Sequence, residues 1–148
     1  MNVSFFNFES YIIIHYFQVT IPDPIFAKLD LVDAEPDLAI KIKKCWATPT
    51  SDEDNPISYV FIDNYQVAYG EGDDVKLIEN CAGSSGAFSV NSFRFGEGNA
   101  KVYLHCQLDI CNGRVNDCNC TNHARKRRNA EDENRIQMSV GPVGLKIT

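Results

Sequence analysis

The feature that most constrains the fold is the alternation of apolar and polar residues from 102 to 110. Val102, Leu104, Cys106, Leu108 and Ile110 are apolar, and the residues between them are Tyr, His, Gln and Asp. Side chains that alternate with a period of two point to opposite faces of an extended chain. The segment is therefore predicted to be a β-strand with one buried face.

The same period recurs along the chain. Similar alternation occupies residues 25–31, 38–42, 59–62 and 75–78, and the apolar run at 11–17 also predicts a strand. Turn-forming stretches such as "IPDP", "TPTSDEDNP", "YGEGDD" and "FGEGN" separate these segments, and no segment has a convincing helical period. The sequence thus predicts an all-β fold, an immunoglobulin-like antiparallel β-sandwich stapled by disulfides.

Two segments break the alternation. In "AFSVNSFRF", Phe88 and Val90 fall on one parity and Phe93 and Phe95 on the other, which predicts a bulge near Ser92. Cys45 is likewise out of phase with the apolar positions of 38–42, so that strand is expected to twist or bulge before Cys45.

Length and charge limit the class of protein. At 148 residues, the chain suits one domain with a real core. Residues 1–124 hold 8 Lys/Arg against 17 Asp/Glu, a local net charge of 8 − 17 = −9. Such a surface repels phosphate backbones, so nucleic acid is excluded as a natural partner. No stretch approaches the roughly 18 apolar residues of a membrane span.

Six cysteines, an even number, favour a secreted domain with disulfides. Cys45 and Cys106 fall on two predicted strands with Trp46 alongside, which is typical of an immunoglobulin-like staple. Cys111 and Cys118 enclose six residues containing "NG", and a bridge there closes a turn easily. These two pairs leave Cys81 for Cys120.

Two sets of residues are candidate metal ligands. Cys118, Cys120 and His123 could bind zinc together with Cys106 or Cys111, but this spacing lacks the paired knuckles of structural zinc sites. The acidic runs at 52–54 and 71–74 lack the spaced loop of a calcium site and are expected to be solvated turns. With no nucleophile–base constellation visible, we expect no metal, no cofactor and no enzymatic activity.

Several motifs together resemble the C-terminal half of a zona pellucida (ZP) module. They are, in order, "CWATPTSDEDNPISYVFIDN", "AFSVNSFRF", "VYLHCQLDIC", a cysteine pair, "RKRR" and "IQMSVGPVGL", and the likeness runs from about Gln18 to the end of the chain. One departure stands out. The family usually has Gly-Cys-Pro after the "YVFIDN" strand, whereas Tyr65 follows Asn64 here and a cysteine appears at Cys81 instead. The partner of Cys81 therefore stays open, although the family pattern agrees with Cys120.

The resemblance implies an extracellular structural domain of a precursor that is cut and then polymerises with other ZP modules into filaments or matrix. The alternative is the ligand-binding ectodomain of a ZP-type membrane co-receptor. Any signal peptide or membrane anchor would lie outside these residues. The expected division is a junction or upstream strand at 1–17, the ZP-C domain at 18–124, a cleavage site at 125–128 and a propeptide at 129–148.

The basic island predicts where the precursor is cut. Arg125, Lys126, Arg127 and Arg128 match the motif of furin-like proprotein convertases, with cleavage expected after Arg128 in a polar, extended segment. A solvated loop, or a heparin-binding or nuclear-import patch, is the alternative interpretation of the island.

Beyond the acidic spacer, the sequence predicts one more strand. Ile136, Met138 and Val140 alternate with polar residues until Gly141 and Pro142 interrupt the pattern. In the family, the corresponding strand is the external hydrophobic patch that blocks premature assembly. Weak glycosylation sequons occur at Asn2 and Asn119, the latter between two cysteines.

Overall fold

The computed structural model describes the backbone of residues 2–7, 10–15, 19–31, 36–68, 70, 72–96, 101–114, 117–120 and 134–146. Side chains are described within these ranges from residue 20 to residue 120. The described residues form strands and turns without an α-helix, and none of them belongs to a helix that could cross a bilayer.

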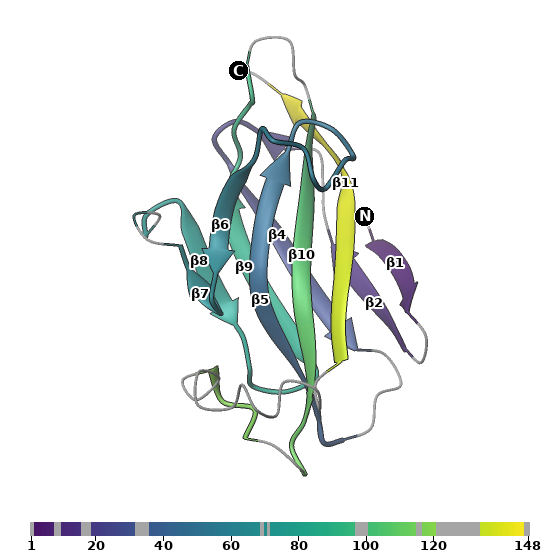
Figure 1. Ribbon diagram of the computed structural model, residues 1–148. Coiled ribbons are helices and arrows are strands. Elements are labelled where there is room, and N and C mark those ends of the chain that lie inside the picture. Colours follow the sequence, from purple (N-terminus) through teal and green to yellow (C-terminus); the bar gives the residue numbers. More distant parts are fainter. Residues whose placement is uncertain are drawn as a thin grey trace.

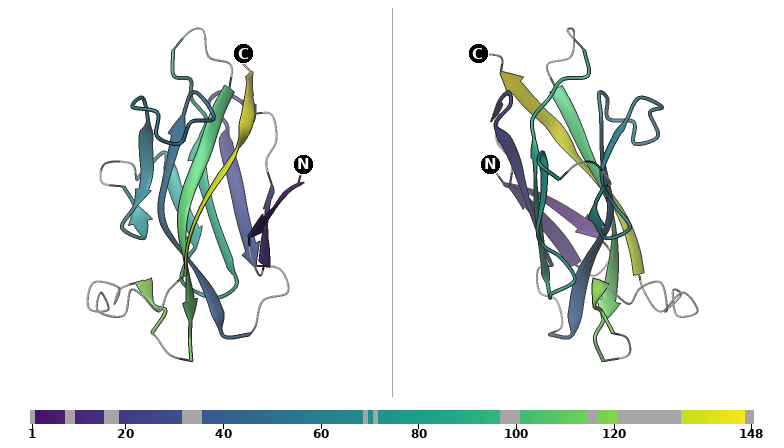
Figure 2. Two further views of the ribbon diagram at one scale, coloured as in Figure 1. Left: turned by 45° about the vertical axis from the view of Figure 1, so that its right-hand side comes forward. Right: turned by 90° about the vertical axis from the view of Figure 1, so that its left-hand side faces the viewer.

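Two sheets face each other in a sandwich (Figures 1 and 2). The five-stranded sheet has the order β1 (Asn2–Asn7), β2 (Ser10–His15), β4 (Pro24–Leu31), β9 (Ser85–Asn91) and β8 (Val75–Glu79). The six-stranded sheet has the order β3 (Val19–Thr20), β11 (Asn134–Lys146), β10 (Lys101–Asn112), β5 (Leu38–Thr48), β6 (Tyr59–Asp63) and β7 (Gln66–Val67). All pairs are antiparallel except β3–β11. The predicted immunoglobulin-like β-sandwich is confirmed.

The core lies between the sheets and follows the alternation of the sequence. On β4, every second residue from Ile25 to Leu31 is buried, as expected for a strand with one face on the core. Phe88 and Val90 of β9 belong to one buried cluster with residues of the facing sheet, which include Ile42, Phe61, Leu104 and Leu108. Gly86 marks a close approach of the sheets, because an added Cβ would lie 2.8 Å from Cδ1 of Ile42.

The phase change before Cys45 has the predicted cause. Gln107 of β10 lies opposite Lys44 of β5, and Leu108 lies opposite Ile42, so Lys43 is an extra residue with no register partner on β10. This bulge returns Cys45 to the core side of the sheet. The out-of-phase position of Cys45 is therefore explained by one inserted residue.

The predicted bulge near Ser92 is wrong. Strand β9 ends at Asn91, and the backbone N–H of Ser92 donates to the carbonyl of Asp23 at 3.0 Å instead of continuing a ladder. Phe93 and Phe95 then pack partly buried against the core from a loop. The register shift beside β9 lies instead on β8, between Leu77 and Glu79.

The N-terminal segment extends the five-stranded sheet. Strand β2 pairs with β4 at Ile12 and Ile13, and β1 pairs with β2 along its whole length. The predicted strand at 11–17 thus corresponds to β2, while Tyr16 and Phe17 lie outside the described residues. Strand β1 has no counterpart among the predicted strands, although residues 1–17 were expected to be a junction or upstream strand.

Candidate processing and assembly site

Strand β11 pairs antiparallel with β10 over almost its whole length. Between Ile110 and Leu104 the register is continuous. On its opposite edge, β11 pairs with β3, at residues 145 and 146 alone among the described residues. Within the described part of the chain, β11 is therefore mostly an edge strand of the six-stranded sheet (Figure 1).

The register places the predicted hydrophobic patch opposite the core face of β10. Directly opposed pairs are Ile136 with Leu108, Met138 with Cys106 and Val140 with Leu104. Leu104, Cys106 and Leu108 are all buried members of the core. Because opposed residues of an antiparallel pair share a face, the three patch positions fall on the core side of the sheet.

The expected interruption of this strand takes the form of a bulge. Strand β11 continues past Gly141 and Pro142 to Lys146, and the register shifts between Val102 and Leu104 of β10. Proline cannot donate to a ladder and is tolerated at bulges, which accounts for a Gly-Pro pair inside a long strand. The predicted interruption at Gly141 and Pro142 thus coincides with the register shift, and the strand continues beyond it.

The outer face of the same sheet carries a buried polar cluster that the sequence did not reveal. Asp109 is fully buried, and the hydroxyl of Tyr65 donates to its Oδ2. Nζ of Lys41, also buried, lies 4.9 Å from the centroid of the Tyr65 ring. Lys41 and Arg135 are the register partners of Asp109 on β5 and β11. A buried carboxylate requires a hydrogen-bond donor, which Tyr65 supplies here. Alternation alone predicted an exposed Asp109.

A second buried group on this face surrounds His105. Its Nε2 lies 2.7 Å from Oγ1 of Thr48, whose hydroxyl donates to the carbonyl of Thr50 at 2.5 Å. The Thr48 oxygen then accepts from His105, which assigns the Nε2-protonated tautomer. The Trp46 ring stacks on His105 with centroids 5.5 Å apart.

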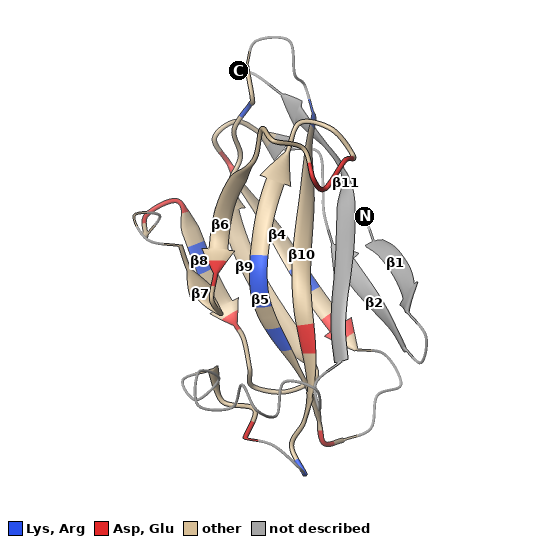
Figure 3. Cartoon of the chain, in the orientation of Figure 1, with Lys and Arg blue, Asp and Glu red and all other residues tan. Residues whose placement is uncertain are grey.

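Burial dominates the electrostatics of His105. It lowers the pKa of the imidazole below its ordinary value of 6.5, against smaller opposing effects from the carboxylates of Glu53 and Asp52. The Trp46 indole N–H donates to the carbonyl of Glu53 at 2.9 Å and so ties the acidic 49–58 loop to the sheet. Figure 3 shows acidic residues in this loop, above the basic segments of β5.

The structure joins the six cysteines in the three pairs that the sequence suggested. Cys45 and Cys106 occupy directly opposed positions of neighbouring strands, with Cα atoms 4.2 Å apart. The expected Cys45–Cys106 pair is therefore present, but it lies within one sheet, whereas the staple of an immunoglobulin domain joins two sheets. Cys81 pairs with Cys120, although the sequence alone left its partner open.

The remaining disulfides fix the chain just before the basic island. Cys111–Cys118 and Cys81–Cys120 have Cα separations of 5.8 and 5.6 Å. They hold residues 117–120 at the end of the sandwich where β10 ends and β11 begins (Figure 1). Residues 121–133, which contain the predicted cleavage site at Arg125, Lys126, Arg127 and Arg128, lie outside the described residues.

The zinc alternative is overturned by these bridges. All six cysteines are in disulfides, so none is left as a thiolate ligand, and His123 lies outside the described residues. No group of three or more His, Cys, Asp or Glu residues in the described ranges is arranged to hold a metal ion. Asn119 is exposed, whereas the side chain of Asn2 is not described.

Comparison with known proteins identifies the family. The zona pellucida ZP-C domain model matches residues 2–121, so the match begins well before Gln18 and ends before the basic island. Mouse pancreatic secretory granule membrane major glycoprotein GP2 is 32% identical over 105 residues, 69% of this chain and 19% of that protein. Rat uromodulin is 30% identical over 101 residues, covering 67% of this chain and 15% of its own length.

A third relative matches more of the chain. Human uromodulin-like 1 is 32% identical over 130 residues, 86% of this chain and 10% of that protein. The chain thus spans less than a fifth of the length of these relatives. The chain belongs to the ZP-C domain family and is an extracellular structural domain of a zona pellucida module.

Proposed function

We propose that this domain belongs to a precursor that polymerises with other ZP modules after a furin-like protease cuts behind Arg128 and β11 is released. The role is structural rather than catalytic. In this proposal residues 129–148 form a propeptide, and β11 is a blocking strand that keeps the precursor unassembled.

The observation that carries the proposal is the register of β11 on β10. The three apolar patch positions lie opposite Leu104, Cys106 and Leu108, which belong to the core. A strand in this register covers the backbone edge of β10. Its removal uncovers both an apolar strip and a row of backbone hydrogen-bonding groups, which together suit a strand from another module.

The arrangement of cysteines supports release after one cut. Residues 129–148 contain no cysteine, and all six cysteines are paired with one another at or before Cys120. The segment 121–133 is therefore the single covalent connection between the disulfide-bonded domain and β11. One cleavage within it leaves β11 held by noncovalent contacts alone.

The energies involved are compatible with a releasable strand. Ordering the backbone of a free peptide opposes its pairing with β10, whereas the tethered strand is already held near its partner. While the tether is intact, the effective concentration of β11 is on the order of millimolar, which keeps the strand paired. After cleavage this advantage is lost, and the peptide dissociates and dilutes.

The second candidate function is ligand binding by the ectodomain of a ZP-type co-receptor. The acidic surface and the ordered 49–58 loop, which Trp46 fixes to the sheet, offer a surface for a protein ligand. We favour polymerisation because a basic cleavage motif followed by an edge strand with alternating apolar residues suits a blocking strand that is released by cleavage. A receptor requires neither feature.

Electron microscopy of material secreted by cells tests the proposal. The complete precursor and its uncleavable variant Arg125→Ala/Arg128→Ala are compared. Filaments are expected from the wild type and not from the variant. Filaments in equal amount from both proteins would show that cleavage does not control assembly. Monomers from both, despite cleavage of the wild type, would favour the receptor function.

A further inference from the structure

A hollow of about 370 Å³ is lined by Pro22, Tyr59, Asp74, Asn91, Ser92 and Phe93. Asp74 precedes β8, Asn91 ends β9, and Tyr59 begins β6, so both sheets contribute to it. Its volume falls within the range of about 300–1,000 Å³ common for small-molecule sites.

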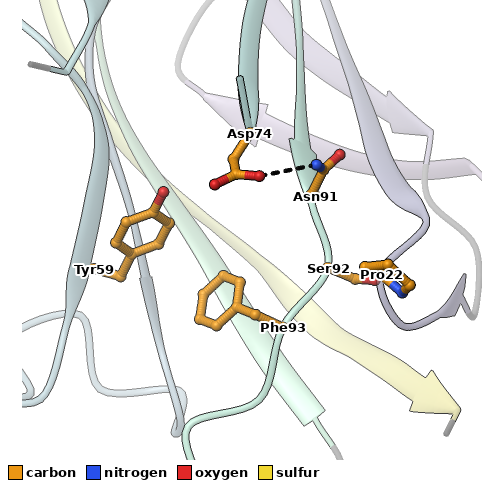
Figure 4. A pocket seen from close by; sticks show the side chains of 6 residues that line it. All are labelled: Pro22, Tyr59, Asp74, Asn91, Ser92 and Phe93. Atoms are coloured by element: carbon orange, nitrogen blue, oxygen red, sulfur yellow. Dashed lines mark hydrogen bonds between the residues drawn. The ribbon is translucent and has the colours of Figure 1, made fainter. Parts of the chain in front are cut away.

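One wall of this hollow is aromatic. The rings of Tyr59 and Phe93 meet edge to face with centroids 5.1 Å apart, and both side chains are only partly buried. Phe93 also contacts the ring of Phe95 at 5.0 Å, which fixes its orientation. In Figure 4 the Tyr59 and Phe93 rings lie across the hollow from the Asp74–Asn91 pair. The wall is thus a preformed apolar surface.

The opposite wall is polar and equally fixed. Nδ2 of Asn91 donates to Oδ1 of Asp74 at 3.1 Å, and the backbone N–H of Asn91 donates to the carbonyl of Asp74 at 2.8 Å. Within the described part of the chain, Oδ2 of Asp74 and Oδ1 of Asn91 accept no hydrogen bond. The second amide hydrogen of Asn91 is a donor beside these acceptors.

We propose that this hollow binds a neutral sugar residue. Each hydroxyl of a sugar both donates and accepts, so adjacent hydroxyls match a carboxylate oxygen beside an amide N–H. The C–H face of a pyranose ring is apolar and suits the aromatic wall. A cationic side chain would use the carboxylate and the rings, but it has no acceptor for the Asn91 N–H donor, whereas a sugar hydroxyl has one.

The sugar can be a free saccharide or part of a glycan carried by a neighbouring module. Because the hollow is open and offers few polar groups, we expect a dissociation constant on the order of 1 mM. Nitrogen-15 NMR of the disulfide-bonded protein, titrated with glucose, galactose, mannose and N-acetylglucosamine, tests the proposal. At least one sugar should give saturable shifts at Asn91, Ser92 and Phe93.

Variants make the result specific. Asn91→Ala should weaken binding at least tenfold, and Asp74→Asn, which keeps the shape of the side chain, should weaken it as well. Asp73→Asn is the matched control, because it removes the neighbouring exposed charge without touching the hollow, and it should bind like the wild type. An unchanged backbone spectrum away from the hollow establishes that each variant is folded.

The remaining arms separate the possible outcomes. Tighter binding of a glycopeptide than of its free sugar would identify a protein-linked glycan as the source, and equal binding would identify free saccharide; both support the sugar site. Saturable shifts with arginine amide and with no sugar would overturn the proposal in favour of a cation site. The absence of saturable shifts with every sugar and glycopeptide would also overturn it.

Discussion

Leu108 of β10 is fully buried and lies directly opposite Ile136 of β11, the first of the three apolar patch positions. This pairing connects the centre of the sandwich to a segment that follows the predicted cleavage site. A change at Ile136 should therefore be felt in the core of the uncut precursor and should lose its effect once β11 has left.

The double variant Ile136→Asp/Val140→Asp should aggregate or be retained inside the cell. A carboxylate placed without a partner on the core side costs about 3–5 kcal/mol, enough to displace the strand before cleavage. Immunoblotting of cell and medium fractions measures retention. Gln137→Asp is the matched control, because its register partner is the half-buried Gln107 on the opposite face, and it should be secreted normally.

Processing should depend on particular residues of the basic island. Arg125→Ala/Arg128→Ala should abolish cleavage, because furin-like convertases require Arg at the cut and a basic residue at the fourth position. Lys126→Ala occupies the position that the protease does not recognise and should be cut at the wild-type rate. Mass spectrometry of the secreted product should find its C-terminus at Arg128 or trimmed from it. Undiminished cleavage of the double variant would exclude this site.

Removal of the disulfides should destabilise the domain in a definite order. Cys45 and Cys106 are 61 positions apart, and replacing both by Ala should lower the free energy of unfolding by about 4 kcal/mol in the chain-entropy model. Cys111 and Cys118 are 7 positions apart, and replacing both should lower it by about 2.5 kcal/mol. Urea unfolding should give the lower midpoint for the first pair. The reverse order would show that strain or cavity effects outweigh loop entropy.

His105 should make stability depend on pH. Because its folded pKa is lowered below 6.5, the unfolded chain binds the proton more readily, and stability falls as pH drops below about 6.5. This contribution is fully present above that pH. Urea unfolding between roughly pH 5 and pH 8 should show a smaller loss for His105→Gln than for the wild type. Parallel curves of unfolding free energy against pH for the two proteins would contradict this role of His105.

Alternation in the sequence was sufficient to predict the principal strands, because each strand has one face in the core. It could not show that the outer face is also covered in places. His105 and Asp109 fall on the polar parity of β10, yet both are buried, His105 beside Trp46 and Asp109 beside Tyr65. Such cover depends on neighbours distant in sequence, which a period of two does not record.

Bulges were harder to predict, because a phase change in the sequence has more than one structural cause. The phase of Cys45 indicated a bulge correctly, but the same signal at Ser92 came from the end of a strand followed by two aromatic residues that pack from a loop. A phase change in sequence does not distinguish these cases. The Cys45–Cys106 bridge was assigned from strand positions, whereas its place within one sheet required knowledge of which strands are neighbours.

The most direct test of the central claim follows β11 itself after cleavage. The complete precursor, secreted while convertases are inhibited, is purified and cut with a furin-like protease, and light scattering and size-exclusion chromatography then follow polymer and the peptide 129–148. We predict that the peptide leaves before polymer appears and that adding it at millimolar concentration, on the order of the tethered strand's effective concentration, suppresses assembly. Polymer that forms while the peptide stays bound, or released protein that remains monomeric, would contradict the account.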